Sequence, residues 1–136
     1  MQEEKEKEKV RVLIADDEED VRRVIAEMLG HGYTILEAGD GEEALQMARV
    51  YKPQLIVMDI FMPKMDGYNA CFELKNDEMT RNIPVVVLSG KAGLLGEKLC
   101  QAIGADAYLD KPFSLLNLLM VTIPLIKGSR KADAVL

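Results

Sequence analysis

The chain has 136 residues, 49% of them hydrophobic, which is enough for one core of ordinary size and too little to suggest a second domain. Its formal net charge of -6 argues against unaided binding to nucleic acid or to an anionic membrane, because both require basic surface.

The two ends of the chain look unlike the part between them. Residues 1–9 alternate Glu and Lys and have nothing to bury, so we predict a charged N-terminal tail. This segment lacks the apolar stretch of a signal peptide, and a cytoplasmic location is therefore expected. Residues 10–127 should form one domain, and residues 128–136 are interpreted as a C-terminal tail or linker.

Short β-branched runs alternate with segments of helical length, which is typical of βα units and a parallel sheet. We expect five strands, at residues 11–15, 34–38, 54–58, 84–89 and 107–110. The third run is almost entirely apolar and suits an interior strand, whereas the second is mixed and suits an edge. These observations predict an α/β fold.

Helices are expected at residues 19–29, 41–50, 67–76 and 94–103, with a last one that begins near Ser114, an acceptable N-cap. The helix at 94–103 should be weakly held, because glycines surround its first turn.

Three glycines are interpreted as turn formers; they are Gly39, Gly41 and Gly67. Cys71 and Cys100 lie in helical patterns and are expected to be buried, reduced thiols.

The last helix is apolar almost all round before Lys127, yet it is too short to insert into a membrane. Pro124 should bend or end it. A helix packed on a sheet buries one face, so the other face either meets another protein or is covered by the C-terminal tail.

Four of the strand runs lead into residues that can do chemistry. Asp16 and Asp17 follow the first run, Asp59 the third and Ser89 the fourth, and Lys111 follows the fifth. In a parallel sheet the carboxyl ends of the strands lie side by side, where open α/β sheets bind ligands. The sequence therefore predicts one pocket with three carboxylates, a hydroxyl and an ammonium.

The charges of this pocket predict a cation. Two unit charges about 4 Å apart repel by about 4 kcal/mol at an effective dielectric of about 20, so three carboxylates need cations or protons. The three carboxylates at -3 and Lys111 at +1 sum to -2, which one divalent ion balances. Carboxylate oxygens favour Mg²⁺, and the sequence has no Cys and His cluster that would favour zinc.

A Mg²⁺ site beside a carboxylate and a lysine is suited to phosphoryl transfer. Asp59 would then be the attacking group and form an acyl phosphate. An ionised aspartate needs no general base, which fits the position of the sole histidine, His31, in a turn at the opposite end of the first helix.

With these residues in place, the sequence resembles the receiver domains of two-component response regulators over residues 10–126. The resemblance rests on five segments in order: IADDE at 14–18, EAGDGEEAL at 37–45, DIFMPKMDG at 59–67, VLSG at 87–90 and GADAYLDKPF at 104–113. It implies a doubly wound (βα)5 fold with a five-stranded parallel sheet in the flavodoxin-like order 2-1-3-4-5.

The resemblance also implies roles for the acidic residues. Asp59 matches the phosphoacceptor. Asp16 and Asp17 match the acidic pair that holds Mg²⁺, Asp17 directly and Asp16 partly through water, and Phe61 would add its backbone carbonyl as a further ligand. Phe61 is also expected to shield the acyl phosphate from water. Gly90, where alanine is usual in the family, and Lys91 are expected to tune the loop beside the phosphoryl group.

For the other residues, the resemblance assigns Ser89 and Lys111 to the phosphoryl oxygens. Tyr108 matches the aromatic switch that moves inward when Ser89 is drawn to the phosphoryl group; the alternative is a plain half-buried aromatic on an edge strand. The bond from Lys111 to Pro112 is expected to be cis.

The leading functional prediction is a switch that takes a phosphoryl group from a sensor histidine kinase or a phosphotransfer protein, and not a turnover enzyme. The helix at 94–103, the strand at 107–110 and the last helix would form its signalling face and a homodimer contact. One alternative is a Mg²⁺-dependent phosphatase or phosphotransferase, against which Phe61 stands where such hydrolases carry a second acid. Others are a scaffold that is not phosphorylated, and the input half of a longer regulator.

Overall fold

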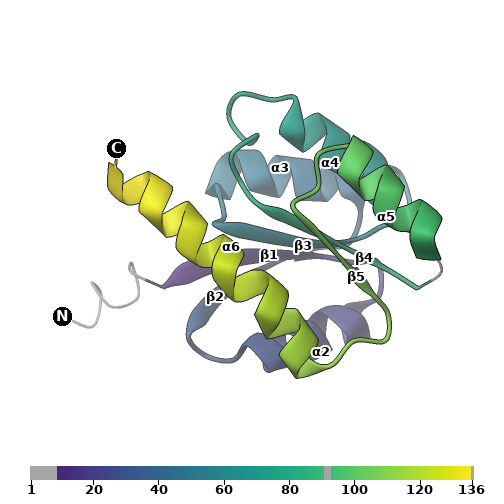
Figure 1. Cartoon of the computed structure of the whole chain (residues 1–136), viewed down its shortest axis with the longest axis horizontal. Helices are drawn as coiled ribbons and strands as arrows, with labels where there is room; N and C mark the ends of the chain where they lie inside the picture. Colours follow the sequence, from purple (N-terminus) through teal and green to yellow (C-terminus); the bar gives the residue numbers. More distant parts are fainter. Residues whose placement is uncertain (1–8, 91–92, 136) are drawn as a thin grey trace.

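A computed structural model describes residues 9–90 and 93–135, so the tail predicted at 1–9 lies outside the described residues except for Lys9. Within this part, five strands alternate with five helices and form three layers, a central sheet covered on both faces (Figure 1). The strands are β1 (Val10–Ala15), β2 (Tyr33–Ala38), β3 (Leu55–Asp59), β4 (Val85–Ser89) and β5 (Ala107–Asp110). All pair in parallel in the order β2-β1-β3-β4-β5, which confirms the predicted fold.

The helices are α2 (Glu19–Leu29), α3 (Gly41–Tyr51), α4 (Gly67–Lys75), α5 (Gly93–Ala102) and α6 (Leu115–Val135). Short polar side chains fix several of their starts. Asp40 accepts a hydrogen bond of 2.8 Å from the Glu43 amide at α3. Ser114 accepts one of 3.1 Å from the amide of Asn117 at α6, and this confirms the predicted N-cap.

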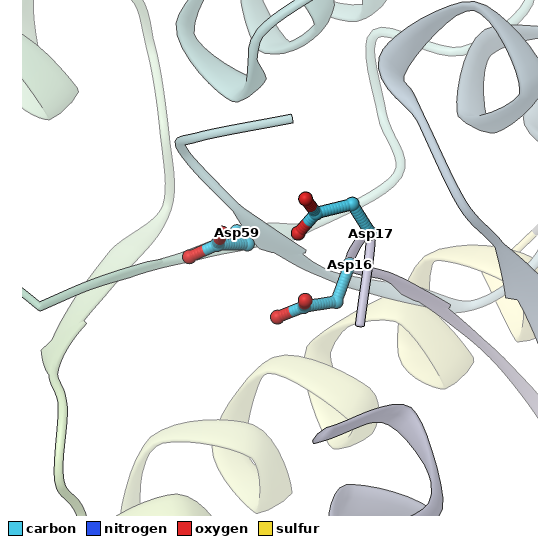
Figure 2. Close-up of side chains that lie close together, drawn as sticks. All are labelled: Asp16, Asp17 and Asp59. Atoms are coloured by element: carbon cyan, nitrogen blue, oxygen red, sulfur yellow. The ribbon is translucent and has the colours of Figure 1, made fainter. Parts of the chain in front are cut away.

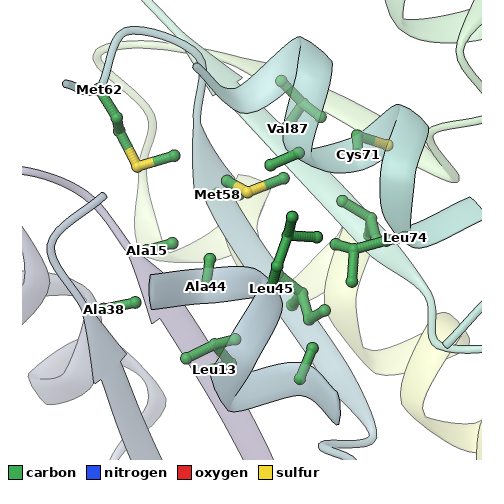
Figure 3. Packing of buried hydrophobic residues seen from close by; sticks show 14 of the residues in the cluster. Leu13, Ala15, Ala38, Ala44, Leu45, Met58, Met62, Cys71, Leu74 and Val87 are labelled. Carbon is green, nitrogen blue, oxygen red and sulfur yellow. The ribbon is translucent and has the colours of Figure 1, made fainter. Parts of the chain in front are cut away.

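Helices α3, α4 and α5 cover one face of the sheet, and α2 and α6 cover the other (Figure 1). Side chains of β3 alternate between two cores, with Ile56 and Met58 toward the first face and Leu55 and Val57 toward the second. Figure 3 shows the first core, where Met58 packs near Leu45 and Ala44 of α3. Each fully buried Met or Leu contributes about 1.5–3 kcal/mol to folding.

The strand register aligns the ends that carry the predicted site. Ala15 of β1 pairs with Met58 of β3, so the residues that follow them, Asp16 and Asp59, arrive at the same level of the sheet. Ser89 at the end of β4 pairs with Asp110 at the end of β5. The strand register therefore places the residues of the predicted site at the same edge of the sheet.

The last helix runs further than predicted. Of the two outcomes predicted at Pro124, a bend or an end, the end is not found, because the helix continues through Gly128 to Val135. Residues 128–135 are therefore helical and extend α6. Proline removes one helical hydrogen bond. We attribute the continuation to packing, because Leu118, Thr122 and Ile126 are buried along the face of α6 that covers the sheet.

Cys71 and Cys100 are buried, as predicted, and are not joined in a disulfide. None of the helices in the described part of the chain combines the length and the hydrophobicity that a membrane crossing requires.

Candidate functional site

Three carboxylates meet at the carboxyl edge of the sheet (Figure 2). Asp16 and Asp17 follow β1, Asp59 ends β3, and one carboxylate oxygen of each lies within 4.8 Å of those of the other two. Asp16 and Asp59 are only 1% and 7% exposed, whereas Asp17 is exposed. The structure thus brings together the acidic residues that the sequence placed in one pocket.

Lys111 joins this cluster from the segment after β5. Its Nζ lies 3.1 Å from Oδ2 of Asp16 and 3.1 Å from Oδ1 of Asp59. Burial alone would lower the pKa of Lys111, but hydrogen bonds and attraction to the two carboxylates raise it overall, so the side chain is an ammonium. The pKa of Asp59 is raised, mainly because burial disfavours the carboxylate, while Lys111 opposes this shift and Asp16 adds to it.

Asp16 is held at its backbone as well as its side chain. The amide of Glu18 donates to Oδ1 of Asp16 at 2.9 Å, and the amide of Asp16 donates to the carbonyl of Ala38 at 3.0 Å. Nη1 of Arg22 donates to the carbonyl oxygen of Asp16 at 2.7 Å, and Nε of Arg22 donates to Oε1 of Glu37 at 2.9 Å. Sequence reasoning missed Arg22 and Glu37, because only the pairing of β1 with β2 brings Glu37 beside the start of α2.

A cavity of about 280 Å³ opens beside the carboxylates and is lined by Asp59, Phe61, Gly90 and Lys111. The Phe61 side chain stands at its edge and is 62% exposed. A Cβ added at Gly90 would meet nothing within 4 Å, so space does not require glycine there. Lys91, expected to tune the same loop, lies outside the described residues.

Ser89 and Tyr108 lie next to one another on neighbouring strands. Ser89 is fully buried at the end of β4, and Tyr108 of β5 is half-buried. The Tyr108 hydroxyl donates to a carboxylate oxygen of Asp110. Burial and this hydrogen bond to Asp110 raise the pKa of Tyr108 to about 12, against the effect of a hydrogen bond with Ser89. Asp110 is a partner that the sequence did not identify, although it stands two residues after Tyr108 on the same side of the strand.

The loop after Asp59 is held by two close backbone approaches. A Cβ at Gly41 would lie 2.2 Å from the carbonyl oxygen of Met65, and one at Gly67 would lie 2.2 Å from the carbonyl oxygen of Asp59. Amide hydrogen bonds accompany both contacts, from Gly41 to Met65 at 3.1 Å and from Gly67 to Ile60 at 2.7 Å. These two glycines are therefore needed for close packing, and their interpretation as turn formers is corrected.

At Gly39, the third glycine that we interpreted as a turn former, a Cβ would make only ordinary contacts, at 3.8 Å or more. The bond between Lys111 and Pro112 is cis, as predicted.

The donor set fits a hard divalent cation. Asp16, Asp17 and Asp59 offer only carboxylate oxygens, and with the ammonium of Lys111 their formal charges sum to -2. Two of the three carboxylates are buried, and buried carboxylates need charge partners. These residues could hold one Mg²⁺.

Comparisons with known proteins agree with this geometry. The sequence model of the response regulator receiver domain matches residues 12–122. A transcriptional regulatory protein of Mycobacterium tuberculosis, PdtaR, is 43% identical over 111 residues, which are 80% of this chain and 53% of that protein. Histidine kinase P4 of Formosa agariphila is 41% identical over 110 residues, which are 81% of this chain and 8% of the kinase. The chain thus spans about half, or much less, of the length of these relatives.

Solved structures show the same fold. The receiver domain of a signal transduction histidine kinase from Syntrophus aciditrophicus superposes with a TM-score of 0.81 at 29% identity, covering 88% of this chain and 91% of that one. The chemotaxis protein CheY4 of Vibrio cholerae superposes with a TM-score of 0.79 at 27% identity, covering 85% and 98%. The chain belongs to the response regulator receiver domain family of two-component systems.

Proposed function

We propose that this receiver domain takes a phosphoryl group onto Asp59 from a histidine kinase or a phosphotransfer protein, in the presence of Mg²⁺. The phosphorylated form then changes conformation and controls a partner or an output. The observation that carries the proposal is the position of Lys111, which contacts Asp59 and Asp16 at 3.1 Å beside an open cavity. A carboxylate, its charge partner and a cavity are thus found in one place, which supports Asp59 as the acceptor.

The transfer needs no general base. A carboxylate oxygen of Asp59 forms a bond to phosphorus while the bond from phosphorus to the donor's imidazole nitrogen breaks and leaves its electron pair on that nitrogen. The imidazole leaves as a neutral group when its other nitrogen carries a proton. Lys111 stabilises the phosphoryl oxygens by exchanging part of its contact with Asp59 for one with the transferred group, and the Ser89 hydroxyl donates to another oxygen.

Asp16, Asp17 and Asp59 would hold Mg²⁺, with the carbonyl of Phe61 as the further ligand expected from the family. When bound, Mg²⁺ supplies positive charge that offsets the oxygen charge spread over the transferred group. Asp16 is fixed by hydrogen bonds at Oδ1 and Oδ2, and this supports a preformed site.

The switch is proposed to begin at Ser89. When the Ser89 hydroxyl is drawn toward the phosphoryl group, the hydrogen bond between Ser89 and Tyr108 weakens. The Tyr108 ring can then rotate inward. The change would reach the face formed by α5, β5 and α6, where Leu99, Leu116 and Met120 are exposed and could form the homodimer contact. The switch is itself modified and is not a turnover enzyme, and we place it in the cytoplasm.

Phe61 is proposed to lengthen the life of the acyl phosphate. Its large apolar side chain lines the cavity beside Asp59, where a hydrolytic water would have to enter. Dephosphorylation of wild type and Phe61→Asn should be compared after removal of the phosphodonor. We expect a faster rate in the mutant, and an unchanged or slower rate would contradict this role.

Hydroxylamine treatment tests where the phosphoryl group sits. It cleaves an acyl phosphate on Asp59 at neutral pH but leaves a phosphoserine at Ser89 intact. The protein should be labelled with phosphoramidate and Mg²⁺, and the label should be lost with hydroxylamine and be absent from Asp59→Asn. A label that resists hydroxylamine would contradict the proposal, and repeated hydrolysis of a phosphomonoester would instead indicate a turnover enzyme.

A further inference from the structure

Arg22 of α2 makes two short contacts that join the acidic site to the neighbouring strand. Its Nη1 lies 2.7 Å from the backbone carbonyl oxygen of Asp16, and its Nε lies 2.9 Å from Oε1 of Glu37 at the end of β2. The Arg22 side chain is only 17% exposed, in contrast to 49% for Glu37. A guanidinium donates in a fixed planar fork, so these two bonds set both the position and the orientation of the group.

Arg22 contacts the backbone carbonyl of Asp16 and not its side chain. The side chain of Asp16 already has partners at both oxygens, the Glu18 amide at 2.9 Å and Lys111 at 3.1 Å. Arg22 instead holds the carbonyl, and this carbonyl belongs to the same rigid peptide unit as the amide of Asp17. Arg22 therefore fixes the plane from which Asp17 projects.

Among the three acidic side chains, the position of the Asp17 carboxylate depends most on the backbone that carries it. It is exposed, whereas Asp16 and Asp59 are buried among neighbours that restrict them. We propose that Arg22 is a positioning residue, which orients Asp17 for a divalent cation by holding the peptide between Asp16 and Asp17. This inference rests on the proposed Mg²⁺ site and adds to it a residue that touches none of the reacting atoms.

The sign of the effect separates positioning from simple electrostatics. Arg22 is a cation close to an anionic site, so by charge alone its removal should make Mg²⁺ bind more tightly. Positioning predicts the opposite, because groups that orient metal ligands typically contribute about 10–100-fold in metal affinity. A role confined to packing would lower stability and leave the affinity of the folded protein unchanged.

The test is a calorimetric titration of the intact chain with MgCl₂ alone at fixed ionic strength. Arg22→Ala should bind Mg²⁺ about tenfold more weakly than wild type. Arg22→Lys should recover most of the affinity, since an ammonium can still donate to the Asp16 carbonyl. The matched control is Arg23→Ala, which removes the same charge from the next residue. That side chain is 61% exposed and pairs with Glu19 and Asp20 at 3.6–3.8 Å. Its affinity should stay within about twofold of wild type.

Unchanged or tighter binding by folded Arg22→Ala would overturn the inference. If Arg22→Ala does not fold, Arg22→Met gives the answer, because it keeps most of the apolar stem and removes the donors to Asp16 and Glu37. We expect it to weaken Mg²⁺ binding about tenfold, and wild-type or tighter affinity in this variant would likewise overturn the inference. A wild-type chain that binds no Mg²⁺ would contradict the proposed function itself.

Discussion

The ammonium nitrogen of Lys111 lies 3.1 Å from Oδ1 of Asp59, and the same nitrogen lies 3.1 Å from Oδ2 of Asp16. The positive charge of Lys111 therefore offsets the repulsion between the two buried carboxylates. It occupies the space between them at the edge of the cavity, where the phosphoryl group is proposed to arrive. Loss of the contacts of Lys111 should therefore change the affinity of the site for Mg²⁺.

Lys111→Gln should bind Mg²⁺ more tightly than wild type while it slows phosphorylation by phosphoramidate. The formal charge of the site changes from -2 to -3, and a gain of about 1 kcal/mol, or about fivefold in affinity, is expected for a partly exposed pair. Calorimetric titration measures the affinity. Lys127→Gln, an exposed lysine of α6, is the charge-matched control. Weaker Mg²⁺ binding by Lys111→Gln would contradict the charge count.

Asp59→Asn should stabilise the protein in the absence of Mg²⁺. Burial raises the pKa of Asp59 above its ordinary 3.8, so the unfolded chain releases this proton at a lower pH than the folded chain. The ionised side chain therefore costs stability above the folded pKa, and the cost disappears as the pH falls below the ordinary value. We therefore expect Asp59→Asn to have a higher free energy of unfolding than wild type at neutral pH.

Urea unfolding of both proteins from neutral pH to about pH 3.5 measures this difference. The two curves should converge at the acidic end, and saturating Mg²⁺ should reverse the order at neutral pH, since only the wild type keeps all three carboxylates. A variant that is less stable than wild type at neutral pH without Mg²⁺ would contradict the prediction.

Gly41→Ala should be strongly destabilising. The new Cβ would lie 2.2 Å from the backbone oxygen of Met65, so the loop after Asp59 would have to move. We expect a loss of about 2–3 kcal/mol. Gly39→Ala is the matched control two residues earlier, where a Cβ would stand 3.8 Å from Nη1 of Arg22, and its effect should stay within about 0.5 kcal/mol. Equal losses in the two variants, measured by urea unfolding, would show that the close approach is not the cause.

Cys71 should be inert in the native protein. Burial raises the pKa of its thiol to about 12, with a smaller opposing effect from Lys75. The thiolate fraction at a given pH is then about three orders of magnitude below that of a free cysteine. Iodoacetamide labelling followed by mass spectrometry should give modification of Cys71 only where urea unfolds the chain. Rapid labelling under native conditions would contradict this account of the core.

The sequence predicted the sheet well because the relevant signals are local. The apolar runs that became β3 and β4 are buried throughout, and the bounds of the first four helices agree with the predicted ones within one residue. The meeting of Asp16, Asp17 and Asp59 was predictable for the same reason, since parallel strands bring their carboxyl ends to one edge.

Contacts between distant segments were not predictable in this way. The pairing of Arg22 with Glu37 depends on the register of β1 and β2, and an arginine in an amphipathic helix looks like a solvated charge. Gly41 looked like a turn residue because its neighbour across the loop, Met65, is known only from the fold. At Pro124 the local preference was outweighed by burial of the face of α6 that covers the sheet.

Phosphorylation of Asp59 is tested most directly by the intact mass of the protein after incubation with a small phosphodonor. Wild type and Asp59→Asn should each be measured with Mg²⁺ and with a chelator in its place. We expect one added phosphoryl group in wild type with Mg²⁺ and none in the other three samples. An added phosphoryl group on Asp59→Asn, or a wild type that is modified equally well without Mg²⁺, would contradict it.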